Sequence, residues 1–240
     1  MKEQIKRTFN MLAHAYENSV DKVSLHNREY ERPSMLRNIP NNARNMRVLD
    51  AGCAAGWYTE QLINRGASVV AIDLSPDMVD ATKRRVKQKA EVLCVDLEKE
   101  LPFDDNSFDM IISSLTLHYI KDWEKTFGEF QRILKSNGVL LYSVHHPFMD
   151  LQISQNEDYF AKELMIDRWN KEGKIIEVAF YRRPMNEMIN VTTTHFIIEK
   201  VIEPQPTQAF KTEAPEKYEK LMKKPHFIIV KAINKKISKL

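Results

Sequence analysis

The stretch 48-VLDAGCAAGWYTEQL-62 has the form of a short strand, a glycine turn and the start of a helix. Gly52 and Gly56 frame the turn, but Ala54 stands where the GxGxxG fingerprint of NAD-binding proteins has its second glycine. The acid before the turn, Asp50, has no part in phosphate binding. It suits a cofactor with an amino-acid tail and no phosphate, because Gly52 permits close backbone approach and a nearby acid manages an ammonium group. The stretch therefore predicts a cofactor loop that differs from the NAD type.

The strand–helix pattern continues toward the C-terminus. Strands are expected at Met46–Asp50, Ser68–Asp73, Ala90–Val95, Phe108–Ser113 and Val139–His145, and helices at Trp57–Asn64, after the N-cap Ser75 and at Trp123–Leu134. Strands that alternate with helices predict a mostly parallel sheet with helices on both faces. Ligands bind at the carboxyl ends of such strands, where the sequence places Asp50, Asp73, Asp96, Ser113 and His145.

The flanking segments extend this core. Residues 1–44 are expected to be helical, and residues 146–184 to form a cap insert over the pocket, with a hairpin around Lys171–Gly173. Residues 185–240 complete the core with a helix at Met185–Thr194, a strand at Phe196–Glu203, a proline-rich turn, a helix at Pro215–Met222 and a strand at His226–Ala232. We therefore expect one α/β domain over residues 1–240, with a seven-stranded sheet and its cofactor-binding core at residues 45–145.

Composition narrows the class of protein. The 240 residues carry a net charge of +3, and 43% are hydrophobic and 29% charged, as in soluble globular proteins. No dense basic stripe interleaved with aromatic residues is visible, so nucleic acid is not an expected partner. Cys53 and Cys94 lack CxxC partners, and no signal peptide or membrane-spanning run is visible. These features predict a cytoplasmic protein, a monomer or homodimer, without disulfides.

Four linked motifs resemble those of the class I S-adenosylmethionine-dependent methyltransferases, in that family's order and spacing. They are VLDAGCAAGWYTEQL, VVAIDLSPDMV, VLCVDLEKELPFDDNSFDMIISSLTLHYIKDW and RILKSNGVLLYSVHHPF, which lie between Met46 and Phe148. The last strands, with VIEPQP and KKPHFIIVKA, are similar to an uncharacterised bacterial subgroup of the small-molecule branch. The resemblance implies a Rossmann-like fold, S-adenosylmethionine as cofactor and S-adenosylhomocysteine as product.

Several residues have expected cofactor roles. Asp73, at a strand end, is placed to accept both ribose hydroxyls, and Asp96 either accepts from the adenine amino group or caps the following turn. Asp50 either manages the cofactor's amino group or caps the turn backbone. The expected contacts are Tyr16, Asp50, Ala51, Gly52, Cys53, Ala54, Gly56, Asp73, Leu74, Met78, Asp96, Leu97, Ser113 and Leu115. Within this set, Cys53 is expected to pack rather than to act as a nucleophile, and Met78 either covers the adenine or fills the core.

Ala54 is the departure from the family pattern, whose usual loop is GCGxG. Its methyl group either forces a backbone with negative φ or crowds the methionine tail of the cofactor. We therefore expect cofactor binding to be weakened rather than abolished.

Three histidines are candidates for catalysis. His145 and His146 follow the fifth strand and His118 the fourth, so that one of them can serve as general base while the others pack or are solvated. Their spacing does not match a metal site, and none is expected. The substrate pocket is expected to involve Tyr30, Tyr119, Phe148, Trp169 and Arg182. For each aromatic residue taken singly, core packing is the more common explanation, and an exposed pair at a hairpin end is the more common explanation for Arg182 and Arg183.

The reaction expected from the resemblance is in-line transfer of a methyl group to a small molecule, which needs positioning more than a fixed catalytic constellation. Ser113–Thr116 contain no NPPY-like tetrad, which argues against methylation of exocyclic base amines. The alternatives are an RNA or protein methyltransferase, a non-catalytic protein that binds S-adenosylmethionine and, weakened by the failed fingerprint, an NAD-dependent oxidoreductase.

Overall fold

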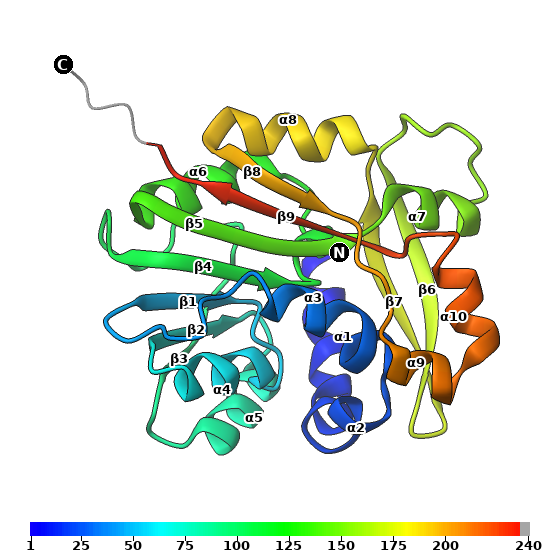
Figure 1. Cartoon of the computed structure of the whole chain (residues 1–240), viewed down its shortest axis with the longest axis horizontal. Helices are drawn as coiled ribbons and strands as arrows, with labels where there is room; N and C mark the ends of the chain where they lie inside the picture. The colour runs from blue at the N-terminus through cyan, green and yellow to red at the C-terminus, as the bar shows by residue number, and fades with distance from the viewer. Residues whose placement is uncertain (236–240) are drawn as a thin grey trace.

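A seven-stranded sheet forms the centre of the computed structural model, which describes residues 1–235 (Figure 1). Its strand order is β3-β2-β1-β4-β5-β9-β8. The first five strands are parallel, and β9 runs antiparallel to both β5 and β8. The strands are β1 Arg47–Ala51, β2 Ser68–Asp73, β3 Glu91–Cys94, β4 Phe108–Ser114, β5 Leu134–His145, β8 Ile197–Ile202 and β9 Phe227–Ile233. The predicted Rossmann-like sheet is confirmed.

Helices cover both faces of the sheet because alternate strand residues point to opposite sides and both sets are apolar. Val48 and Val69 pack beneath α3 and α4, with α5 beside them, whereas Leu49 and Val70 pack toward α6 and α8 on the other face. The helices are α3 Arg32–Leu36, α4 Trp57–Asn64, α5 Pro76–Val86, α6 Trp123–Ile133 and α8 Met185–His195. Ser75 caps α5 as expected, since its Oγ accepts the backbone N–H of Met78 at 3.2 Å.

The N-terminal segment is helical but irregular. It consists of α1 Lys2–Ala15, a π-helical turn at Tyr16–Val20, α2 Asp21–Val23 and a second π-helical turn at Asn27–Glu31, which leads into α3. Single π-helical turns often occur at functional sites, because they re-aim side chains without ending the helix. Here, Tyr16 and Glu31 lie in these two turns, and both face the cavity described below.

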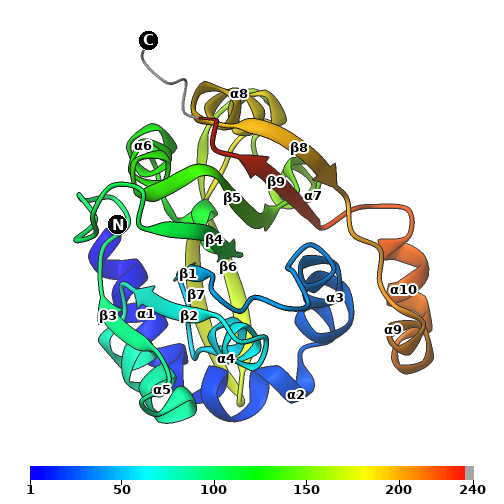
Figure 2. The same ribbon diagram turned by 60° about the vertical axis from the view of Figure 1, so that its left-hand side comes forward.

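Two inserts stand at the carboxyl end of the parallel strands. The first contains α7 Pro147–Ile153 and an antiparallel hairpin, β6 Glu163–Lys171 and β7 Lys174–Arg182, that does not join the main sheet. The second contains α9 Gln208–Glu213 and α10 Pro215–Leu221. Figure 2 shows the hairpin passing between α1 on one side and α9 and α10 on the other.

The sequence missed three features of this architecture. It did not foresee α7 or α9, and it started the fifth strand at Val139, whereas β5 begins at Leu134, directly after α6. Both missed helices are short, and α9 depends on tertiary contact because Phe210 is buried in a cluster with Tyr30 and Phe227. No helix within residues 1–235 is long and apolar enough to cross a membrane.

Candidate active site

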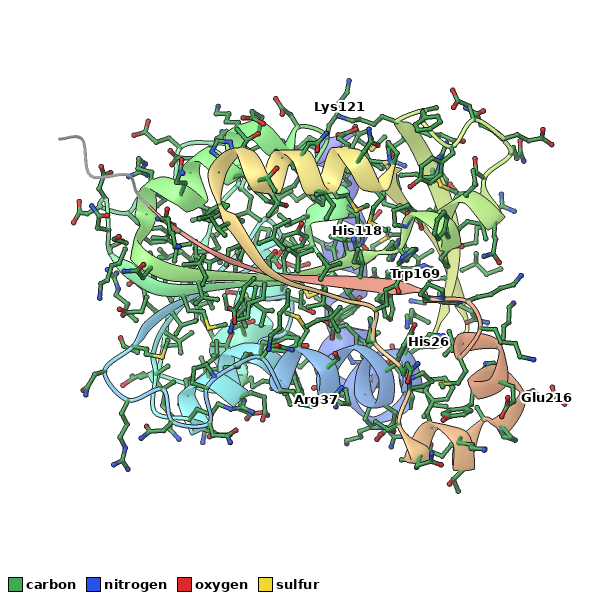
Figure 3. The ribbon with its side chains drawn as sticks, turned by 45° about the horizontal axis from the view of Figure 1, so that its top comes forward. His26, Arg37, His118, Lys121, Trp169 and Glu216 are labelled. Carbon is green, nitrogen blue, oxygen red and sulfur yellow. The ribbon has the colours of Figure 1, made fainter. Side chains whose placement is uncertain are left out.

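A cavity of about 1000 Å³ lies where the parallel strands end. Its floor comes from the loops after β1, β2, β3 and β4 and from the end of β5, and its walls come from the N-terminal segment, the β6–β7 hairpin, α10 and the start of β9. Figure 3 shows His118, Trp169 and His26, which line this cavity, following one another along the carboxyl end of the sheet. This volume is at the upper end of the range for small-molecule sites, so it has room for more than one ligand.

The loop after β1 requires glycine at position 52. Gly52 has a φ of +85°, and a Cβ built there would lie 2.2 Å from Oγ1 of Thr116 in the loop after β4. The N–H of Gly52 donates to the carbonyl oxygen of Ile72 at 2.8 Å. The loop after β1 therefore lies in close contact with the end of β2 and with the side chain of Thr116 at the cavity floor.

Ala54 also has a left-handed backbone, with a φ of +46°. The expectation that its methyl group forces a negative φ is therefore wrong. The loop keeps the conformation suited to glycine because the N–H of Ala54 donates to Oδ2 of Asp73 at 2.9 Å and its carbonyl accepts from Oγ1 of Thr82 at 2.6 Å. Ala54 thus retains a backbone that costs an L-residue about 1–2 kcal/mol.

Asp73 and Asp96 both line the cavity. Oδ1 of Asp73 accepts the N–H of Ser75 at 2.9 Å, and burial raises the pKa of this carboxyl group to about 6. Asp96 has partners on both oxygens, since Oδ2 accepts from Nζ of Lys2 at 2.8 Å and Oδ1 accepts the N–H of Glu98 at 2.9 Å. Lys2 therefore fastens the start of α1 over the loop after β3.

Five of the expected cofactor residues support the floor without lining the cavity, namely Asp50, Ala51, Gly56, Met78 and Ser113. Asp50 is buried and accepts from the side-chain hydroxyl of Thr59 in α4 at 2.6 Å. Burial raises the pKa of Asp50 to about 7. Met78 is fully buried beside Leu12, which fits its core alternative.

The remaining expected cofactor residues do line the cavity: Tyr16, Gly52, Cys53, Ala54, Asp73, Leu74, Asp96, Leu97 and Leu115. Burial holds the pKa of the Cys53 thiol well above its usual value, and its Sγ lies 3.6 Å from Oγ1 of Thr82, as expected of a packing residue. Leu115 has a φ of +48°, so the loop after β4, like the loop after β1, places a non-glycine residue with a left-handed backbone on the cavity floor.

His118 and His145 stack against each other on the cavity wall, with ring centroids 4.0 Å apart and an interplanar angle of 18°. Both ring nitrogens of His118 are buried without a hydrogen-bond partner in the described chain, and burial, with His145 and Arg183 nearby, holds its pKa well below the usual value. Nδ1 of His145 lies 3.3 Å from Oδ1 of Asp150, which is itself buried. The two atoms are close enough for an ion pair, but their geometry is not that of a hydrogen bond.

His146 is buried away from the cavity. Its Nδ1 accepts the N–H of Phe148 at 3.2 Å and so caps α7, while its Nε2 lies 2.9 Å from Oε1 of Glu203. Because Nδ1 accepts, the ring proton of the neutral form lies on Nε2, which donates to Glu203. The structure does not bring this predicted catalytic candidate into the site.

The predicted substrate pocket is only partly assembled. Tyr119 and Trp169 line the cavity, but Tyr30, Phe148 and Arg182 do not. Tyr30 is buried and its hydroxyl accepts the N–H of His226 at 3.0 Å, whereas Phe148 is 52% exposed. Arg182 and Arg183 are fully buried, so the alternative of an exposed arginine pair is wrong as well. Arg182 instead pairs with Glu163 and donates to the carbonyl oxygens of Asp158 and Tyr159.

The sequence missed a group of charged residues that the fold brings to the cavity. Glu31 is buried and accepts from the hydroxyls of Tyr58, Ser114 and Ser143 at 2.7, 2.8 and 2.6 Å. Other ionisable residues that were missed include Asp21, His26, Arg32, Arg85, Lys171, Lys217 and His226. They come from the N-terminal segment, α5, the hairpin, α10 and the start of β9, and no local motif marks them.

Comparison with known proteins agrees with this geometry. Residues 49–142 match the family model of a methyltransferase domain. A malonyl-[acyl-carrier protein] O-methyltransferase of Halorhodospira halophila is 31% identical over 147 residues, which are 60% of this chain and 48% of that protein. The chain thus spans about half the length of that curated relative.

Solved structures extend the comparison. A Listeria monocytogenes protein assigned to the S-adenosylmethionine-dependent methyltransferases is 25% identical, with a TM-score of 0.74 over 86% of this chain and 97% of that one. The 1,6-didemethyltoxoflavin-N1-methyltransferase of Burkholderia thailandensis, solved with S-adenosylhomocysteine, shares the fold at 15% identity, with a TM-score of 0.62 over 98% of this chain and 88% of that one.

The strand order and the loop after β1 define a Rossmann-like methyltransferase. Residues 49–142 form a methyltransferase domain, and the fold is similar to that of S-adenosylmethionine-dependent methyltransferases. S-adenosylmethionine is the cofactor of that family, and the residues present fit it. Gly52 and Ala54 provide a close backbone approach, and Asp73 provides a partly buried carboxylate with lone pairs left for a ribose diol.

Replacement of Ala54 by glycine should stabilise the protein. A left-handed backbone is strained for alanine and free of that strain for glycine, so we expect the free energy of unfolding to rise by about 0.5–1 kcal/mol in urea titrations. Ala55→Gly is the matched control, because Ala55 is buried without a positive φ and its replacement should destabilise. A lower free energy of unfolding in Ala54→Gly would contradict the proposal that the left-handed backbone of Ala54 is strained.

The buried carboxyl groups predict a pH-dependent stability. Burial raises the pKa of Asp50 to about 7, from 3.8 in an unfolded chain, so the folded protein holds a proton that the unfolded chain releases. The contribution of Asp50 to the free energy of unfolding should therefore be lost as pH rises from about 4 to about 7.

Urea titrations across that range should show the stability difference between wild type and Asp50→Asn shifting in favour of the variant as pH rises. The buried histidines make the free energy of unfolding rise with pH, but they are the same in both proteins, so their effect cancels in this difference. Asp104→Asn, at an exposed loop position, is the control and should show no such shift. A wild-type advantage that grows with pH would contradict the buried, protonated Asp50.

Proposed function

We propose that this methyltransferase acts on a small molecule held in the cavity, with S-adenosylmethionine as the methyl donor and S-adenosylhomocysteine as the product. One observation carries the proposal: a single cavity joins the Gly52 loop and Asp73 to the stacked pair His118 and His145, beneath the β6–β7 hairpin. An enclosed site of this kind favours a small acceptor over RNA or a folded protein surface.

S-adenosylmethionine, when bound, supplies a methyl group on a sulfonium, which is a good leaving group. The protein's own residues then have two tasks: to place the acceptor in line and to exclude water. The N-terminal segment and the hairpin enclose the cavity, with Phe9, Tyr16 and Tyr119 in edge-to-face contact and Trp169 on the hairpin wall. Asp73 and the backbone of Gly52 and Leu97 hold the cofactor side.

His145 is suited to accept a proton from the acceptor. Asp150 lies against Nδ1 of His145, which favours the tautomer with its proton on Nδ1 and leaves Nε2 as the basic atom. His118 stacks on the same ring and stays neutral, because burial disfavours its charged form. His118 can therefore hydrogen-bond the acceptor through a nitrogen that has no partner in the described chain.

The cofactor half of the proposal is tested by calorimetric titration with S-adenosylmethionine and S-adenosylhomocysteine. Wild type should bind both, whereas Asp73→Ala should lose at least about tenfold in affinity, because charged hydrogen bonds to the ribose are removed. NAD is the negative control ligand. Binding of NAD, or unchanged affinity in Asp73→Ala, would contradict the site.

The acceptor half is tested by methyl-transfer assays. Several curated relatives are named malonyl-[acyl-carrier protein] O-methyltransferases, so a malonyl thioester is the first acceptor to assay, followed by phenols, amines and thiols. With an acceptor that must lose a proton, such as a phenol or a thiol, His145→Gln should lower kcat by about 10²–10⁴ and remove the acidic limb of the pH profile, whereas a carboxylate acceptor needs no base. His146→Gln, outside the cavity, should keep both. A normal pH profile in His145→Gln would exclude His145 as the base.

A further inference from the structure

Four basic side chains from separate parts of the chain line the same cavity. They are His26 in the N-terminal segment, Lys171 at the end of β6, Lys217 in α10 and His226 just before β9. We propose that this cluster, here called the basic wall, binds a carboxylate or phosphate group of the methyl acceptor. The inference rests on the proposed function for the identity of the ligand, but not for its charge.

The members of the basic wall lie close to one another. The rings of His26 and His226 stack with centroids 5.7 Å apart and an interplanar angle of 25°. Lys171 and Lys217 line the same cavity as His26, whose pKa is lowered by burial and then by the charges of Lys217 and Lys171. Lys171 Nζ also lies 5.7 Å from the Trp169 ring, which orients it along the cavity wall.

The carboxylates of the cavity are all engaged elsewhere. Three of them form ion pairs: Asp21 with Arg32 and Arg85, and Asp96 and Glu98 with Lys2. The other three accept hydrogen bonds. Glu31 accepts from three hydroxyls, Asp73 from two backbone N–H groups, and Asp167 from Nε1 of Trp169 at 2.8 Å. By contrast, neither Lys171 nor Lys217 has a carboxylate partner anywhere in residues 1–235. The basic wall therefore has positive charge that the protein itself does not neutralise.

The basic wall also adjoins the proposed reaction centre. His226 precedes Phe227, whose ring centroid is 6.2 Å from that of His145, and His145 in turn lowers the pKa of His226, which burial and neighbouring charges bring to about 4. At neutral pH the histidines are thus neutral hydrogen-bond donors beside two ammonium groups. An acceptor held at His145 can reach this wall with a second, negatively charged end.

The wall is tested with inorganic phosphate and acetate as probes, and their binding is monitored by the ¹H–¹⁵N signals of the histidine rings, both in the protein alone and with S-adenosylhomocysteine in excess. Each anion should shift the His26 and His226 signals to saturation. In the double variant Lys171→Met and Lys217→Met, the concentration for half saturation should rise at least about tenfold, since charged hydrogen bonds are lost while the aliphatic stems remain. Lys174→Met, exposed in the same hairpin turn, is the matched control and should leave it unchanged.

The outcomes separate the two anions and the two proposals. Saturation at a lower concentration of phosphate assigns a phosphoryl group, and saturation at a lower concentration of acetate assigns a carboxylate. No saturable shift with either probe, or equal shifts in the double variant, would overturn the basic wall. Calorimetry with S-adenosylhomocysteine on the same samples tests the cofactor site independently. Saturable anion binding at the basic wall without binding of S-adenosylhomocysteine would contradict the proposed function and leave the basic wall standing.

Discussion

The carboxylate of Asp73 is the constraint on which the site depends. One oxygen accepts the N–H of Ala54 and the other that of Ser75, so a single side chain fixes the loops after β1 and β2 relative to each other. This bond holds Ala54 in a left-handed conformation that its side chain disfavours, and it keeps the loop in the form that a glycine would adopt. Because the carboxyl group is partly buried, it also titrates near neutrality. The loop's shape, its strain and its charge thus share one cause.

The second determinant is what encloses the strand ends. The parallel sheet brings acids and histidines to one edge, but the cavity exists only because the N-terminal segment, the β6–β7 hairpin and the α9–α10 insert are packed around that edge. Lys2 fastens the first of these to Asp96, and the buried cluster of Tyr30, Phe210 and Phe227 anchors the last. The sheet edge therefore carries the residues proposed for the cofactor together with His118 and His145, while the packed segments close the cavity around them.

The sequence predicted the core well because its signals are local. Apolar runs, glycine turns and the Ser75 cap act within a few residues, so the sheet, its order of strands and helices, and cavity residues such as Asp73 and Leu97 could be read directly. The predictions from the sequence failed where tertiary contacts determine which residues reach the cavity. His146 and Arg182 looked like site residues from their positions, yet the fold buries both in structural contacts, and His26, Glu31 and Lys171 reach the cavity from segments without a motif. The positive φ at Ala54 was missed because a distant carboxylate imposes it.

Hydrogen–deuterium exchange with and without S-adenosylhomocysteine tests the central claim most directly, since it locates binding along the chain without requiring an acceptor. Slower exchange should be confined to the Gly52–Gly56 loop, residues 73–75 and 96–98, and the N-terminal segment that covers them. Protection elsewhere, or none at these positions despite saturating ligand, would contradict the assignment of this cavity as the cofactor site.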